Sequence, residues 1–109
     1  MNDKQRRTVV WLKYNKHCAY CGTKIRYEDL EVDHREARSK GGKDSKANYN
    51  PSCFTCNHYK KNHSLEQFRT LLKHLTARID DYYLVKVARK FGMVDTEPWD
   101  GIFYFEKFK

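Results

Sequence analysis

The sequence predicts an α+β fold in which short strands and helices are held together by a bound metal ion. Three observations lead to this prediction: two Cys-x-x-Cys pairs, short segments of alternating polarity between them, and helical periodicity on either side. The pairs are Cys18 with Cys21 and Cys53 with Cys56, and they use every cysteine of the chain. A chain of 109 residues typically folds around one core, so we expect a single domain over residues 1–109.

The composition favours a small protein that binds a polyanion. Only 39% of the residues are hydrophobic, so the core should be small and should need a disulfide or a bound metal ion to stabilise it. The polar start of the chain and the absence of any apolar run near ~20 residues predict a cytoplasmic protein with no membrane span. The formal net charge of +8 indicates nucleic acid as the partner more readily than a membrane.

The N-terminal segment is expected to be helical over residues 4–14, because Val10 and Tyr14 share one face at the i, i+4 interval. Asn15 should end this helix in a left-handed conformation. The turn around Cys18 and Cys21 follows directly and should present two thiolates to one ion.

Two strands and a loop are expected between the cysteine pairs. Residues 24–27 and 30–34 alternate polar and apolar side chains, and Glu28-Asp29 between them supplies turn chemistry, so they should form a hairpin. Residues 35–49 have no periodicity and contain Gly41-Gly42 among many basic side chains. This stretch is expected to be a mobile, basic loop.

The remainder of the chain is expected to contain helices and one terminal strand. Residues 53–63 should turn from the second cysteine pair into a short helix. Ser64 has capping-box spacing to Gln67 and should start a longer one. That helix carries one apolar stripe, made of Leu65, Phe68, Leu71, Leu72, Leu75 and Ile79. Residues 82–91 should form a helix ending at Gly92, and the aromatic residues 102–108 a strand that fills the core.

The four cysteines favour a structural zinc site. Their spacing is C-x2-C-x31-C-x2-C, and each pair can supply two corners of a tetrahedron. A site closed by four thiolates leaves no position for a substrate, so the zinc should support folding and not catalysis. The alternatives are two disulfides, which a reducing compartment disfavours, and an iron site of rubredoxin type.

A second constellation comprises Asp33, His34 and Asn57. Carboxylate and amide oxygens are hard ligands of the kind Mg²⁺ accepts, and Asn57 directly follows the last cysteine, so the zinc site sets its position. Neighbouring residues of a strand point to opposite faces. Asp33 and His34 can therefore serve one site only if the strand ends or bends there.

The order of these residues resembles the HNH endonuclease family, which has a ββα-metal fold with a cysteine-bound zinc. The resemblance covers residues 18–61 and leaves residues 64–109 as a C-terminal extension. It implies that His34 is the general base, and that Asp33 and Asn57 hold the catalytic metal ion, Mg²⁺ or Mn²⁺. It also implies that Asn48, five residues before Cys53, holds the loop and orients the histidine.

The roles of two asparagines and two histidines in this region remain open. Asn50 competes with Asn48 for the orienting role, although the spacing to the second cysteine pair favours Asn48. His58 and His63 match no part of the motif and are expected to be exposed or to cap a helix.

The function predicted on this basis is metal-dependent hydrolysis of DNA phosphodiester bonds, in which His34 activates water. A single site should nick one strand at a time unless the chain forms a homodimer. Basic side chains should contact the phosphates without reading bases. The candidates are Arg35, Arg38, Lys43, Lys60 and Lys61. The alternatives are a zinc-stapled module that binds nucleic acid, DNA or RNA, without catalysis, and a protein-interaction module.

Overall fold

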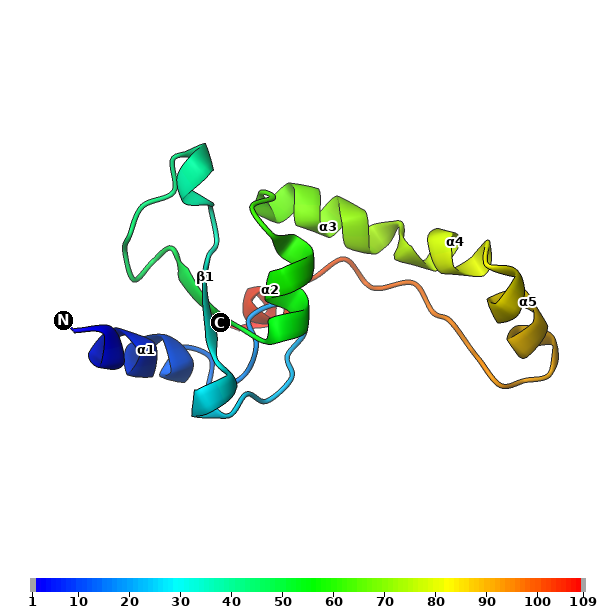
Figure 1. The fold of residues 1–109 in the computed structure, drawn as a ribbon, viewed down its shortest axis with the longest axis horizontal. Helices are drawn as coiled ribbons and strands as arrows, with labels where there is room; N and C mark the ends of the chain where they lie inside the picture. The colour runs from blue at the N-terminus through cyan, green and yellow to red at the C-terminus, as the bar shows by residue number, and fades with distance from the viewer. Residues whose placement is uncertain (1, 109) are drawn as a thin grey trace. The chain divides into compact units, whose positions relative to one another are not determined.

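The computed structural model describes residues 2–108, which divide into two compact units (Figure 1). Unit 1 comprises Met1–Leu65 and Ile102–Lys109, and unit 2 comprises Glu66–Gly101. The division therefore lies next to residue 64, where the C-terminal extension is expected to begin. None of the described helices is long and apolar enough to cross a membrane.

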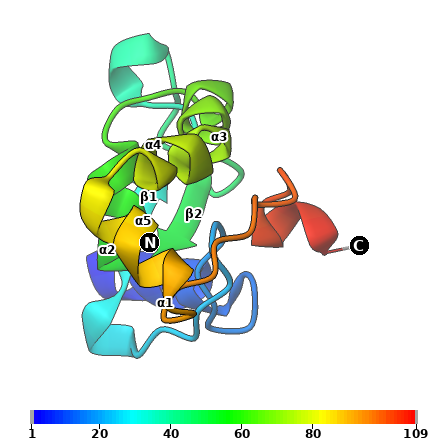
Figure 2. The ribbon, with the colours of Figure 1, turned by 90° about the vertical axis from the view of Figure 1, so that its right-hand side faces the viewer.

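Unit 1 contains one antiparallel sheet of two short strands, β1 (Glu31–His34) and β2 (Tyr49–Ser52). They run side by side in Figure 2, with Asp33 opposite Asn50 and His34 opposite Tyr49. The predicted loop over residues 35–49 is confirmed in large part, since a 3₁₀ turn at Arg38–Lys40 is the only regular element described between the strands. The strands of this sheet therefore flank the loop.

The expected hairpin between residues 24–27 and 30–34 is wrong. Lys24 makes only an isolated bridge to His17, and Tyr27–Asp29 is a 3₁₀ turn. Side chains from the N-terminal helix bind the carbonyl groups that a strand partner would need. Arg7 donates to the carbonyl oxygens of Tyr27 and Leu30, and the Trp11 indole donates to that of Ile25 at 2.8 Å.

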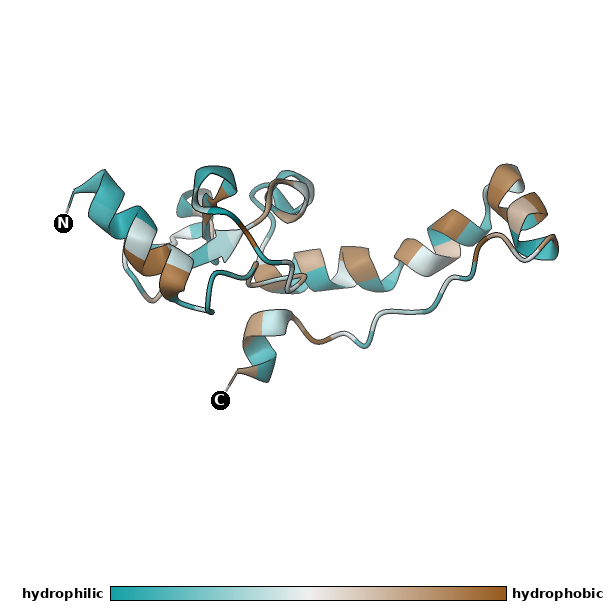
Figure 3. Ribbon diagram, turned by 90° about the horizontal axis from the view of Figure 1, so that it is seen from below, coloured by the Kyte–Doolittle hydropathy of each residue, from teal (hydrophilic) through white to brown (hydrophobic). Residues whose placement is uncertain are grey.

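The N-terminal helix α1 (Asp3–Leu12) confirms the predicted helix over residues 4–14. It starts at a reciprocal capping box between Asn2 and Gln5, and the chain leaves it through Asn15 at a φ of 55°, as expected. Figure 3 shows hydrophilic first turns and a hydrophobic last turn, and Val10 in that last part is buried. The helix is thus anchored at its C-terminal end.

Helix α2 (Phe54–Lys60) confirms the short helix predicted after the second cysteine pair. It packs against β1 and follows β2 directly, so β1, β2 and α2 form a ββα unit. Lys13 ties the end of α1 to this unit, because its ammonium group donates to the Tyr49 carbonyl at 2.8 Å and to that of Lys46 at 3.1 Å. The α+β fold class is confirmed.

The C-terminal aromatic segment forms core, as expected, but it is not a strand. Tyr104–Lys107 is a 3₁₀ helix, and Phe103 and Phe105 are buried. The backbone N–H groups of Tyr104 and Phe105 donate to the carbonyls of Tyr20 and Ala19, so the segment is bound to the turn between Cys18 and Cys21. No neighbouring strand is available to it there among the described residues, and Glu106 caps the Phe103 N–H at 2.8 Å.

Unit 2 consists of α3 (Leu65–Lys73), α4 (Leu75–Asp80), α5 (Tyr83–Lys90) and an irregular return segment. Each helix carries hydrophobic residues in Figure 3. The single helix expected after Ser64 is interrupted at His74, although helical hydrogen bonds still run from the His74 N–H to the Thr70 carbonyl and from the Arg78 N–H to the His74 carbonyl. The predicted end of α5 is confirmed, since Gly92 has a φ of 71°.

The formal charge is distributed unevenly between the two units. Residues 66–101 contain six acidic and six basic side chains, so unit 2 has no net charge and the whole +8 belongs to unit 1. Several of the charges in unit 2 are paired internally, as where Arg89 donates to Asp80 at 2.6 Å and to the Thr96 hydroxyl at 2.7 Å. A polyanionic partner would therefore interact with unit 1.

Candidate metal centre and active site

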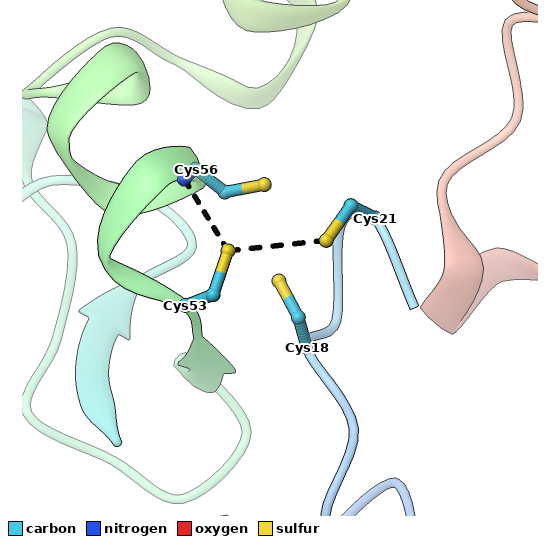
Figure 4. Close-up of side chains that lie close together, drawn as sticks. All are labelled: Cys18, Cys21, Cys53 and Cys56. Atoms are coloured by element: carbon cyan, nitrogen blue, oxygen red, sulfur yellow. Dashed lines mark hydrogen bonds between the residues drawn. The ribbon is translucent and has the colours of Figure 1, made fainter. Parts of the chain in front are cut away.

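The four cysteine sulfurs of unit 1 gather at one point (Figure 4). All four lie within 4.8 Å of one another, and none of the four is in a disulfide. The sulfurs of Cys21 and Cys53 are 3.8 Å apart. A zinc ion with Zn–S bonds of about 2.3 Å requires tetrahedral edges of about 3.8 Å, so the cluster fits a tetrathiolate zinc site. If all four sulfurs bind the ion, no corner of the tetrahedron is left for a substrate.

Local structure explains how the two cysteine pairs meet. The first pair lies in a tight turn, closed by hydrogen bonds from the Cys18 N–H to the Thr23 carbonyl and from the Gly22 N–H to the Cys18 carbonyl. Cys53 is the N-cap of α2, and its sulfur accepts the Cys56 N–H. The Ala19 N–H donates to the Pro51 carbonyl at 2.8 Å and joins the turn to β2.

Beside the cysteine cluster, Asp33 belongs to a buried polar network. Its side chain is 6% exposed, and its Oδ2 accepts hydrogen bonds from the Tyr20 hydroxyl at 2.5 Å and the Lys60 ammonium group at 3.2 Å. Lys60 is fully buried and also donates to the His34 carbonyl at 3.0 Å. Burial raises the pKa of the Asp33 carboxyl, and the contacts with Tyr20 and Lys60 oppose that rise.

The prediction that Lys60 contacts phosphate is wrong. Its side chain is 0% exposed and its ammonium group is already bound to Asp33 and to the backbone of β1. Lys60 follows Asn57 by three residues, and the prediction placed both on an exposed face of α2. Lys60 instead lies on the face of α2 that β1 covers. Lys60 therefore joins α2 to β1.

His34 occupies the last position of β1, and its ring is held on two sides. Its Nε2 lies 2.7 Å from Oδ1 of Asp44, and its ring lies nearly perpendicular to the Tyr49 ring at a centroid distance of 5.2 Å. The side chain is 21% exposed, so solvent reaches it. The imidazole is thus both oriented and accessible, which a general base requires.

Asn48 holds the loop, but its side chain does not bond the His34 ring. Its amide oxygen accepts the Glu36 N–H at 2.8 Å, and its amide nitrogen donates to the carbonyls of Glu36 and Lys43, each at 2.9 Å. Asn50 is buried in β2 and approaches the Tyr20 hydroxyl at 3.5 Å. The side chain within hydrogen-bond distance of the imidazole is that of Asp44.

The remaining candidates lie on α2 and on the loop. Asn57 is half-buried, and among residues 2–108 its side-chain amide makes no hydrogen bond. His58 is exposed and stacks on the ring of Phe54, and His63 is half-buried. Four of the five predicted phosphate-binding residues are exposed, namely Arg35, Arg38, Lys43 and Lys61.

Two residues that contact the site were not predicted. Tyr20 lies between the first two cysteines, and this position is the signal that could have identified it. A tyrosine buried beside a metal cluster needs a hydrogen-bond partner for its hydroxyl group. Asp44 follows Gly41-Gly42 within an otherwise basic loop, and an acidic residue in such a loop is the signal that could have identified it.

Comparison with known proteins supports the resemblance noted in the sequence. Residues 18–63 match the family model described as HNH endonuclease. That segment contains both cysteine pairs, both strands and the whole of α2. A search of curated proteins found no match to the chain.

Removal of one zinc ligand should unfold unit 1. The free energy of binding a structural zinc, about 10–16 kcal/mol, exceeds the stability of most small domains. We expect Cys53→Ser to lose bound zinc, measured by elemental analysis, and to lose the cooperative thermal transition seen by circular dichroism. Thr55→Ser, in the same turn, is the control and should keep both. A zinc-free Cys53→Ser variant that still melts cooperatively would contradict the assignment.

Loss of the Lys60 ammonium group should destabilise the protein by about 3–5 kcal/mol, because the Asp33 carboxylate would remain buried without its counter-charge. We expect this loss for Lys60→Met in urea denaturation. The exposed neighbour provides the control, since Lys61→Met should change the free energy of unfolding by less than about 0.5 kcal/mol. Equal stability of the two variants would show that Lys60 has no such role.

Proposed function

We propose that the chain hydrolyses DNA phosphodiester bonds in a metal-dependent reaction, because residues 18–63 match the HNH endonuclease family model. The observation that carries the proposal is the environment of His34, whose ring is oriented by two neighbours yet open to solvent at the end of β1. A zinc-stapled binding module has no need of an imidazole held in this way.

The substrate phosphates would bind to the basic side chains around His34. Arg35, Arg38 and Lys43 lie on the loop that follows β1, and Lys61 lies at the C-terminal end of α2. All four are exposed, and they belong to the unit that carries the entire net charge. Such contacts fix the position of the DNA backbone on the protein but do not recognise the base sequence.

The catalytic metal ion, Mg²⁺ or Mn²⁺, would be held by Asp33 and Asn57. Both offer hard oxygen ligands, as these ions require. Tyr20 and Lys60 fix one carboxylate oxygen of Asp33 and so orient the other, and the Asn57 amide is not engaged by the described residues. When bound, the ion supplies charge stabilisation to the phosphate and to the departing 3′ oxygen.

The chemistry assigned to the chain itself is proton transfer. His34 takes a proton from a water molecule aligned for attack on the phosphorus, while the basic side chains neutralise the phosphate. Asn48 would influence His34 indirectly. Its side chain binds Glu36 and Lys43 and so holds the loop that carries Asp44. The products would have 5′-phosphate and 3′-hydroxyl ends, and one site would nick one strand at a time.

Removal of the imidazole should abolish cleavage without affecting the fold. We expect His34→Ala to lower the rate of plasmid nicking by about 10²–10⁴-fold, the factor that a positioned general base supplies. Supercoiled plasmid would be incubated with the zinc-loaded protein, with and without added Mg²⁺, and nicked and linear products followed over time. His74→Ala, a variant of an exposed histidine of unit 2, should cleave like the parent. Undiminished cutting by His34→Ala would remove His34 from the mechanism.

Binding to duplex DNA should depend strongly on salt. If each of the four exposed basic residues contacts one phosphate, the slope of log affinity against log salt should be about -3.6. Fluorescence anisotropy with the His34→Ala protein would measure binding without cleavage. Lys61→Gln should reduce the magnitude of the slope by about 0.9, whereas Lys86→Gln on α5 should leave it unchanged. A slope near zero would exclude the phosphate contacts.

A further inference from the structure

Among residues 2–108, Asp44 is the acidic residue whose side chain lies within hydrogen-bond distance of the ring of the proposed general base. Its Oδ1 lies 2.7 Å from Nε2 of His34. We infer that Asp44 is a positioning residue that holds His34 in the Nε2–H tautomer and leaves Nδ1 as the nitrogen that accepts the proton from water. This role rests on the proposed nuclease function, but the contact itself can be tested without cleavage.

The loop holds Asp44 in place for this contact. Gly42 donates its N–H to the Ala37 carbonyl, and a side chain at Gly42 would collide with the backbone of Glu36, so only glycine allows the loop to close so tightly. Asn48 then binds the carbonyl of Lys43, the residue before Asp44. The carboxylate is therefore presented by an ordered turn.

Neighbouring side chains stabilise the negative charge of Asp44. The Arg38 guanidinium donates to the same Oδ1 at 2.8 Å, and this contact, together with that of His34, lowers the pKa of the Asp44 carboxyl. An aspartate carboxyl is ionised at neutral pH, and the lowered pKa extends this charged state to more acidic pH. An ionised carboxylate can only accept a hydrogen bond, so the proton of a neutral His34 must reside on Nε2.

The tautomer decides which nitrogen can act as the base. With the proton on Nε2, Nδ1 carries the free lone pair, and the ring orientation is set by Asp44 at Nε2 and by the nearly perpendicular ring of Tyr49. When Nδ1 takes a proton from water, the ring becomes positively charged, and the carboxylate stabilises that charge. Asp44 touches neither water nor phosphate in this scheme, and it acts through His34.

The contact can be tested by nuclear magnetic resonance on the zinc-loaded protein, with histidine labelled with ¹⁵N and neither DNA nor Mg²⁺ present. Long-range ¹H–¹⁵N correlations distinguish the two neutral tautomers by the nitrogen that carries the proton. We expect His34 to be mainly Nε2–H in the parent protein, and Asp44→Ala to give a mixture. Glu28→Ala, which removes another exposed carboxylate of unit 1, should leave the His34 signals unchanged.

Kinetics on plasmid substrate provide the second measurement. Asp44→Ala should lower kcat at least about 10-fold, within the factor that a positioned base supplies, while KM should not rise, because Asp44 itself contacts no phosphate and its loss frees Arg38 to bind one. A structural defect alone would instead lower the melting temperature. Asp44→Asn keeps the shape of the side chain and serves as a second variant should the truncation disturb the loop.

The outcomes separate this inference from the proposed function. If the parent cleaves DNA but Asp44→Ala retains both the Nε2–H tautomer and the parental kcat, the inference is wrong and the nuclease assignment stands. If the parent does not cleave DNA but the tautomer shifts in Asp44→Ala, the positioning contact stands and the nuclease assignment fails. A shift of tautomer with a matching loss in kcat supports both.

Discussion

The cluster of four cysteine sulfurs is the constraint on which the rest of unit 1 depends. It joins a turn near the N-terminus to the first turn of α2, and the 31 residues between the two pairs include both strands and the loop. A two-stranded sheet of this size has little stability of its own. The cysteine cluster and the aromatic side chains that pack on the first cysteine turn lie against this sheet and add the contacts that it needs for stability.

A second set of contacts, entirely of protein groups, determines how the helix meets the sheet. A fully buried lysine on α2 bonds both the carboxylate and the backbone of β1, and a tyrosine from the first cysteine turn bonds the same carboxylate. Buried charges are costly unless their partners are correctly placed. The network therefore favours one alignment of α2 on β1.

The features predicted from the sequence are those that depend on local spacing. The cysteine cluster, α1, α2 and the end of α5 follow from intervals of two to four residues. The pairing of β1 with β2 could not be predicted from local spacing, because the two strands lie on either side of the loop. The residues expected to pair with β1 are instead bound through their carbonyls by Arg7 and Trp11 of α1. The burial of Lys60 and the contact of Asp44 with His34 likewise arise only after the chain has folded.

The uneven distribution of charge has a kinetic consequence for encounters with a polyanion. One part of the chain carries the whole excess of positive charge, and the helical part from residue 66 to residue 101 carries none. Long-range attraction would act on the first part alone and would accelerate and orient its approach, most strongly at low ionic strength. The neutral part would not compete for that approach and would stay free for contacts of a different kind.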